Sequence, residues 1–147
     1  MAAVRTATVS WNGDLTSGEG TVSAGTSQLF MDLPVSWASR TEEPAGRTSP
    51  EELLAAAHAS CYAMAFSGDL TRAGTPPEHL HVEAEVTFER VDEKWTVVSS
   101  RLIVLGRVPG CSEEQFHRIA EQSRDGCPIS RALKGNVELS VEPTLEQ

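Results

Sequence analysis

The sequence lacks several features that would assign it to common classes of protein. It has no run of about 18 consecutive apolar residues, which a membrane-spanning helix needs. Its N-terminal segment shows no positive charges followed by an apolar run, so no secretory leader is expected. Basic residues are few: 12 Lys and Arg stand against 21 Asp and Glu, a net charge of −9. Nucleic acids and anionic membranes bind basic surfaces and are therefore not expected partners. These absences favour a cytoplasmic protein.

Cysteine is also scarce, and the spacing of the three thiols excludes two kinds of local site. Cys61, Cys111 and Cys127 form no C-x-x-C pair, so neither a zinc ribbon nor a thioredoxin-type motif is expected. The histidines show no ligand spacing either, and we expect no metal and no cofactor. In a reducing compartment a disulfide is more often catalytic or redox-sensing than structural.

The strongest secondary-structure signal is a long helix between Ser49 and Gly74. Ser49 suits the N-cap, Pro50 the first helical position, and Glu52 completes a capping box. Gly74 suits the C-terminal end. Apolar residues surround almost the whole circumference. Such a helix is typical of a central element that is packed on several sides.

The rest of the chain predicts an α+β fold, with antiparallel sheets around this central cysteine-bearing helix. At 147 residues, one domain over residues 1–147 is expected. Residues 34–48 lack a clear period and are expected to form a loop. Alternating residues and turn signals indicate strands at 4–11, 18–24, 28–33, 81–91, 95–108 and 136–141, and helix starts at Ser112 and Pro128.

Candidate chemistry centres on Cys61, in the middle of the long helix. A free cysteine in an Ala-rich helix is most often a small buried hydrophobic residue. Three features favour a chemical role for Cys61. His58 shares its helical face, Glu51 at the helix start can organise an arginine, and Cys127 is expected to cap a short helix. Backbone N–H groups at a helix start favour a thiolate.

On the residues alone, two other functions stay open. A non-catalytic redox-sensing or binding domain would have a structural Cys61 with no charged neighbour. A cysteine hydrolase would need His58 bonded to Cys61 and an oxyanion hole. His58 taken alone is more typical of a core or interface histidine, and Cys111 is expected to be a bystander.

Two stretches carry a resemblance to a known family. The P-E-E-L…A-A-x-H-A-x-C pattern of Ser49–Cys61 and the G-C-P-I-S pattern of Gly126–Ser130 resemble the signature stretches of the OsmC/Ohr family. These are the osmotically induced and organic-hydroperoxide-resistance proteins. The segments Ser10–Asp14, Gly18–Gly20 and Pro109–Gly110 also resemble the OsmC branch. The resemblance covers nearly the whole chain.

The resemblance implies a peroxiredoxin-like, cysteine-based hydroperoxide reductase that acts in oxidative and osmotic stress defence. Cys61 matches the peroxidatic cysteine and Cys127 the resolving cysteine. Glu51 matches the glutamate that holds the catalytic arginine, which is expected to be Arg40, with Arg47 the weaker candidate. The family fold is an intertwined homodimer with residues of both chains in each site. The oxidised form is expected to be recycled by a dithiol donor such as a lipoylated protein.

Physical chemistry agrees with those roles. Burial raises the pKa of a thiol, and an arginine held by Glu51 would supply the compensating positive charge. The same charge would stabilise the alkoxide that leaves the peroxide. The sulfenic acid formed on Cys61 would then condense with Cys127 to a disulfide. We expect His58, Leu54, Met64 and Phe66 to line or support a substrate pocket for organic hydroperoxides. Phe30 and Trp37 are further candidates for its walls.

Overall fold

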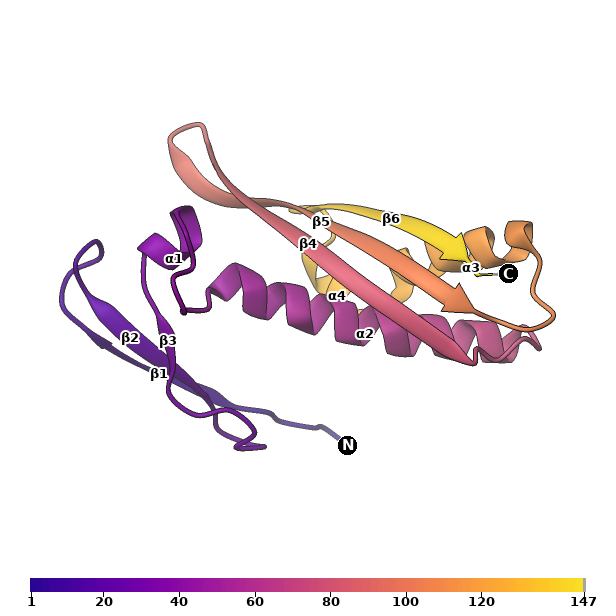
Figure 1. Cartoon of the computed structure of the whole chain (residues 1–147), viewed down its shortest axis with the longest axis horizontal. Coiled ribbons are helices and arrows are strands. Elements are labelled where there is room, and N and C mark those ends of the chain that lie inside the picture. The colour runs from indigo at the N-terminus through magenta and orange to yellow at the C-terminus, as the bar shows by residue number, and fades with distance from the viewer. Residues whose placement is uncertain (147) are drawn as a thin grey trace. The chain divides into compact units, whose positions relative to one another are not determined.

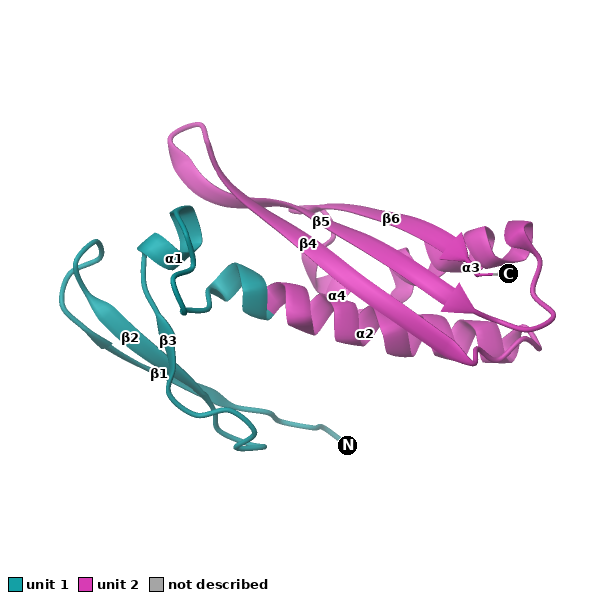
Figure 2. Ribbon diagram, viewed as in Figure 1, with its two compact units in different colours: residues 1–53 teal, residues 54–147 magenta. Residues whose placement is uncertain are grey.

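The structure is a computed structural model that describes residues 1–146. The chain divides into two compact units, of which the first covers residues 1–53 and the second begins at Leu54 (Figure 2). Among the described residues, no helix is both long enough and apolar enough to cross a membrane.

The first unit contains a three-stranded antiparallel sheet in the order β1-β2-β3. Its strands are β1 (Ala7–Asn12), β2 (Glu19–Ala24) and β3 (Leu33–Val35). Val22 and Ala24 of β2 are buried, whereas every residue of β1 is exposed. The first two strands occupy the expected stretches, and they leave an uncovered apolar edge in the single chain.

Residues 28–48 differ from the sequence-based expectation. The strand expected at residues 28–33 is wrong, because Gln28 and Asp32 adopt the left-handed conformation (φ 56° and 55°), which interrupts an extended strand. The expected loop contains a one-turn helix, α1 (Ala38–Thr41). Ser36 and Ser39 stabilise its start, because each side chain accepts a hydrogen bond from the other's backbone N–H at 3.2 Å.

Helix α2 (Pro50–Arg72) starts as the sequence predicts. The Ser49 hydroxyl accepts a hydrogen bond from the Glu52 N–H at 3.1 Å. The Glu52 carboxylate does not complete the capping box with Ser49 but accepts from the Thr48 hydroxyl at 2.6 Å. Ser49 therefore caps the helix, while Glu52 fixes the chain that enters it.

The C-terminal end and the buried stripe of α2 are equally well defined. Gly74, with φ 88°, follows the helix, and the Thr75 N–H donates to the Leu70 carbonyl at 2.9 Å, a Schellman arrangement. One side of the helix is left open in the single chain, where Met64 is 74% exposed. The fully buried side chains recur every fourth residue: His58, Tyr62, Phe66 and Leu70.

The second unit contains a three-stranded sheet in the order β4-β5-β6, with helices beside it (Figure 1). Strands β4 (His79–Val91) and β5 (Lys94–Arg107) form a long antiparallel hairpin. Helices α3 (Glu113–Gly126) and α4 (Pro128–Leu133) follow, and β6 (Glu138–Leu145) completes the sheet.

The last strand departs from the expected antiparallel arrangement. β6 lies parallel to β5, with Glu138 opposite Ser99 and Leu145 opposite Gly106. Parallel neighbours require a crossover of a dozen or more residues, which α3 and α4 provide. The α+β class is confirmed, and the sheet of the second unit is mixed.

One continuous core holds the second unit together. It combines the buried stripe of α2 with alternate residues of β5 and the apolar face of α3, including Leu102, Val104 and Phe116. Each large apolar side chain that is buried contributes roughly 1.5–3 kcal/mol. Cys127 lies in this core and is fully buried.

Gly106 provides a test of this packing. A Cβ at Gly106 would lie 2.7 Å from the ring of Phe116, which is fully buried and has no room to move. We expect Gly106→Ala to lower the free energy of unfolding by about 1–3 kcal/mol, as overpacking does. Urea unfolding followed by circular dichroism measures this.

Gly68→Ala is the matched control, because Gly68 lies within α2 and a Cβ there would meet only the flexible Arg72 side chain, at 3.5 Å or more. Alanine favours a helix over glycine by about 1 kcal/mol, so this variant is expected to be as stable as the parent or more stable. Equal unfolding curves for Gly106→Ala and the parent would contradict the packing described here.

Candidate active site

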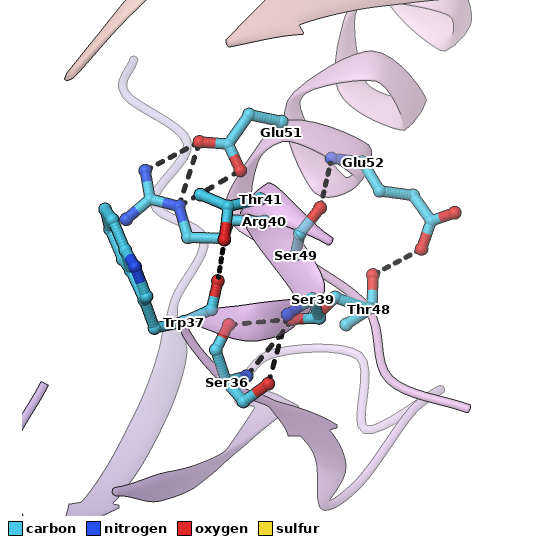
Figure 3. Close-up of polar contacts among 9 residues, drawn as sticks. All are labelled: Ser36, Trp37, Ser39, Arg40, Thr41, Thr48, Ser49, Glu51 and Glu52. Atoms are coloured by element: carbon cyan, nitrogen blue, oxygen red, sulfur yellow. Dashed lines mark hydrogen bonds and ion pairs between the residues drawn. The ribbon is translucent and has the colours of Figure 1, made fainter. Parts of the chain in front are cut away.

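Arg40 and Glu51 form a tight ion pair in the first unit (Figure 3). Arg40 Nη2 donates to Glu51 Oε1 at 2.6 Å, and Nε lies 3.1 Å and 3.2 Å from the two carboxylate oxygens. The Glu51 side chain is only 9% exposed, against 27% for Arg40. A buried carboxylate needs such a partner, because desolvation of an unpaired charge costs several kcal/mol.

The elements around this pair hold it in place. Arg40 lies in α1, and the Ser39 hydroxyl contacts both the Ser36 carbonyl (2.8 Å) and the Thr48 carbonyl (2.7 Å). Trp37 lies beside the guanidinium, with Cζ of Arg40 5.4 Å from the ring centroid. Glu51 is in the first turn of α2, where the helix dipole favours a negative charge.

Arg47 does not take part in this cluster. Its Nη2 lies 3.2 Å from Glu19 Oε1, and both side chains are substantially exposed. Of the two arginines that the sequence offered, Arg40 is therefore the one that Glu51 holds.

An apolar hollow of about 370 Å³ lies beside Arg40 in the first unit. Trp37 was expected near a pocket, but the contribution of the N-terminal strands was not. The alternating sequence of β1 predicts a strand, but it does not indicate that this strand lines a hollow. The apolar wall is formed chiefly by Val9, Trp11, Leu15, Val35, Trp37 and Leu53.

Cys61 and Cys127 come together in the second unit. Both are free thiols, Cys61 partly exposed and Cys127 buried, and Cys61 packs against the core that contains Cys127, close enough for the two thiols to interact. Cys127 caps α4, as the sequence predicts, and its sulfur accepts from the Ser130 N–H at 3.4 Å. The separation of 66 positions between the two cysteines (127 minus 61) is thus no barrier to their approach.

The surroundings of Cys61 in this unit disfavour its thiolate. Burial raises the pKa of Cys61, and the neighbouring Cys127 thiol raises it further. The Ile129 N–H, in the first turn of α4, donates to the sulfur and acts in the opposite direction without cancelling these effects. An ionised Cys61 therefore requires an additional positive charge.

His58 is fully buried and uses both ring nitrogens. Nδ1 lies 2.6 Å from the Ser100 hydroxyl and Nε2 2.8 Å from the Ser130 hydroxyl. Because both nitrogens are engaged, His58 is not paired with Cys61, and the cysteine hydrolase reading is wrong. Ser130 belongs to the G-C-P-I-S stretch, whereas nothing in the sequence marks Ser100.

The residues expected to line a substrate pocket lie in different surroundings. Leu54 is partly buried, and Met64 lies on the exposed side of α2. Phe66 is a core residue, fully buried with its ring centroid 5.5 Å from that of Tyr62 and 5.1 Å from that of Phe116. Direct contact of Phe66 with a substrate is therefore not supported, and a supporting role stays a prediction.

Cys111 lies in the turn before α3 and packs against the core, and its thiol donates weakly to the Ser112 carbonyl at 3.6 Å. Within residues 1–146, no group of three or more His, Cys, Asp and Glu side chains is arranged to hold a metal ion.

Known proteins share both the sequence and the fold of this chain. The family model described as "OsmC-like protein" matches residues 43–142. The chain is 36% identical over 132 residues to "Peroxiredoxin OsmC" of Escherichia coli K12. The aligned region covers 90% of this chain and 91% of that protein. Two solved structures are similar in fold. They are OhrB, the organic hydroperoxide resistance protein of Bacillus subtilis (TM-score 0.72, 22% identity, 96% and 98% of the two chains), and the OsmC-like protein of Mycoplasma pneumoniae (TM-score 0.73, 18% identity, 100% of both).

Burial of His58 has a consequence for stability. Burial lowers the pKa of His58 below its ordinary value of 6.5. Below pH 6.5 the unfolded chain binds a proton that the folded chain does not, so stability is complete above that pH and falls as the pH drops. We expect this residue to remove up to about 1.4 kcal/mol per pH unit over that window. Unfolding by urea between pH 5 and 8 measures it.

His58→Gln should remove this component of the pH dependence, whereas His81→Gln, which changes an exposed histidine, is the matched control. Should His58→Gln fail to fold, an NMR titration of the His58 ring gives the same information. A ring that titrates at or above 6.5 in the folded protein would contradict the expectation.

Proposed function

The chain belongs to the OsmC-like protein family, and from this premise we propose that it is a peroxiredoxin-like enzyme that reduces organic hydroperoxides to alcohols. One observation carries the proposal: Cys61 packs against the core that contains Cys127, and the two thiols are close enough to interact, although they are 66 positions apart in the sequence. Two thiols in contact can hold a sulfenic acid and resolve it without large movement.

The proposed reaction has two steps on these sulfurs. The Cys61 thiolate attacks the terminal peroxide oxygen, the O–O bond breaks, and the alkoxide leaves and takes up a proton. Cys61 becomes a sulfenic acid. The Cys127 sulfur then attacks the Cys61 sulfur and the S–O bond breaks. The products are a Cys61–Cys127 disulfide and water. An external dithiol reduces this disulfide and restores both thiols.

Arg40 is the proposed activating cation. Burial and the Cys127 thiol raise the pKa of Cys61, so the thiolate needs a positive charge that the surroundings of Cys61 in the second unit do not supply. Glu51 holds the Arg40 guanidinium through three contacts of 2.6–3.2 Å. A guanidinium fixed in this way would stabilise both the thiolate and the departing alkoxide.

The proposed substrates are organic hydroperoxides with an apolar group. The hollow beside Arg40 has mostly apolar walls, and Trp37 and Leu53 contribute to them. An alkyl chain gains roughly 0.8 kcal/mol for each CH₂ group that it buries. Hydrogen peroxide gains nothing from such walls, so the hollow favours alkyl hydroperoxides.

An intertwined homodimer with residues of both chains in each site completes the proposal. The single chain exposes large apolar side chains on both units, among them Val9 (63%), Leu15 (58%) and Met64 (74%). Apolar surface of this kind is typical of a surface that a partner covers. One domain over residues 1–147 is also proposed, supported by a family match that spans the boundary between the units.

The cellular role follows from the family and is likewise proposed. The enzyme would act in the cytoplasm against oxidative and osmotic stress, with a dithiol donor such as a lipoylated protein as its reductant. These assignments depend on the peroxidase reaction and are secondary to it.

The reaction is tested by following the loss of tert-butyl hydroperoxide in the presence of a dithiol. We expect Cys61→Ser to abolish consumption, because it removes the nucleophile. Cys127→Ser should consume peroxide more slowly and form no Cys61–Cys127 disulfide, because only the added dithiol can then reduce the sulfenic acid. Mass spectrometry should find a Cys61–Cys127 disulfide in the parent protein. Consumption that survives Cys61→Ser, or never occurs in the parent, would favour a non-catalytic redox-sensing or binding domain.

The role of Arg40 is tested by comparing Arg40→Ala with Arg47→Ala, its matched control. We expect Arg40→Ala to slow peroxide consumption on the order of 100-fold at pH 7, as loss of one transition-state charge partner does. Its rate should rise with pH, because burial raises the pKa of Cys61. Arg47→Ala should leave the rate unchanged. Equal losses in both variants would argue against Arg40 as the activating cation.

A further inference from the structure

The second unit contains a chain of buried hydrogen bonds to which the two steps described above assign no role. It runs from Ser100 on β5 through His58 on α2 to Ser130 on α4, and ends at the Cys127 sulfur. All four residues are fully buried. Its three links measure 2.6, 2.8 and 3.1 Å, the last from the Cys127 sulfur to the Ser130 hydroxyl.

The donor at the Cys127 end of the chain fixes the direction of all three hydrogen bonds. The Cys127 thiol donates to the Ser130 hydroxyl oxygen. The Ser130 hydroxyl proton is then free to be donated to His58 Nε2. A neutral imidazole that accepts at Nε2 carries its proton on Nδ1 and donates it to Ser100. The chain therefore links the Cys127 thiol to an imidazole nitrogen that has an open lone pair toward it.

We propose that Ser130 and His58 form a proton relay that deprotonates Cys127 during disulfide formation. This inference rests on the proposed two-cysteine reaction. Ser130 contacts the reacting sulfur and is a catalytic residue in this scheme. His58 acts through Ser130 and is a positioning residue that also stores the proton.

As the Cys127 sulfur attacks the Cys61 sulfenic acid, its proton moves to the Ser130 oxygen, and the Ser130 hydroxyl proton moves to His58 Nε2. The S–S bond forms and the S–O bond breaks. The leaving hydroxide takes up the proton that the relay holds and departs as water, so that the Cys127 proton ends on the water and no proton is gained or lost. Cys127 is oxidised and the sulfenic sulfur is reduced.

Burial makes such a relay necessary. The thiolate and not the thiol is the nucleophile in disulfide formation, yet Cys127 is fully buried, and solvent bases have no direct access to its proton. Burial also lowers the pKa of His58, which keeps the ring neutral and able to accept a proton at neutral pH.

Other titratable groups near Cys127 do not replace this route. Cys61 and Tyr62 of α2 face it, and burial raises the pKa of both, so neither is a ready base. The charges of Arg124 on α3 and Asp69 on α2 act on Tyr62. The contact that β5 makes with the relay is the neutral Ser100.

The test separates the two half-steps in single-turnover experiments with one equivalent of tert-butyl hydroperoxide. Sulfenic acid on Cys61 is trapped with a 1,3-dione, and the disulfide is followed by mass spectrometry. We expect Ser130→Ala to form sulfenic acid at the parent rate but to close the disulfide on the order of 100-fold more slowly at pH 7. Closure in the parent should vary little between pH 6.5 and 8.5, whereas in Ser130→Ala it should rise steeply with pH.

Ser123→Ala is the matched control. Ser123 is also fully buried and donates one hydrogen bond, to Asp69 Oδ2 at 2.6 Å, so its loss has a similar structural cost. It lies outside the relay, and its closure rate and pH profile should match the parent. A Ser130→Ala variant with the parent's closure rate and pH profile would overturn the relay.

A second measurement needs no turnover. The ¹⁵N shifts of the His58 ring in the reduced parent protein report which nitrogen carries the proton. We expect the Nδ1–H form, and an Nε2–H form would overturn the relay. If no sulfenic acid forms on Cys61 in the parent, the proposed function itself fails, and the ring shifts still decide the direction of the hydrogen bonds.

Discussion

The desolvation of the Cys61 thiol is the constraint on which the rest of the proposed site depends. A cysteine on a core-facing helix is partly removed from water, and that raises its pKa. The backbone N–H of Ile129 offsets a part of this cost, and the contact with Cys127 adds to it. The chain thus places its candidate nucleophile where the thiolate is disfavoured. The Arg40 guanidinium, which Glu51 holds, is the positive charge that we propose for this role.

Helix α2 carries several residues of the proposed site. Its first turn carries the buried Glu51 carboxylate, its middle carries Cys61, and its buried stripe includes the hydrogen-bonded His58. The short helix α4 complements it, because successive N–H groups of its first turn, those of Ile129 and Ser130, reach the two sulfurs. Each sulfur is therefore oriented by backbone, which side-chain substitutions leave in place.

Local signals allowed much of this to be predicted from the sequence. Ser49 and Ser112 cap their helices, and Cys127 caps α4, because capping depends on a few adjacent residues. Features that depend on distant partners were not predictable. The parallel pairing of β6 follows from the path of the crossover, which alternation along β6 does not encode. Ser100 became a partner of His58 only because β5 passes α2. Phe66 fitted a pocket wall by composition, but its neighbours in the core decide otherwise.

The absence of a side chain on β5 has a consequence for the thiols. At Gly106 the ring of Phe116 occupies the space that a methyl group would fill. Phe116 lies on α3, and α3 leads directly into Cys127 and α4. The clearance at Gly106 therefore fixes how closely α3 approaches the sheet, and with it the depth at which Cys127 is held. A residue that touches neither sulfur thus helps to determine the distance that a disulfide must span.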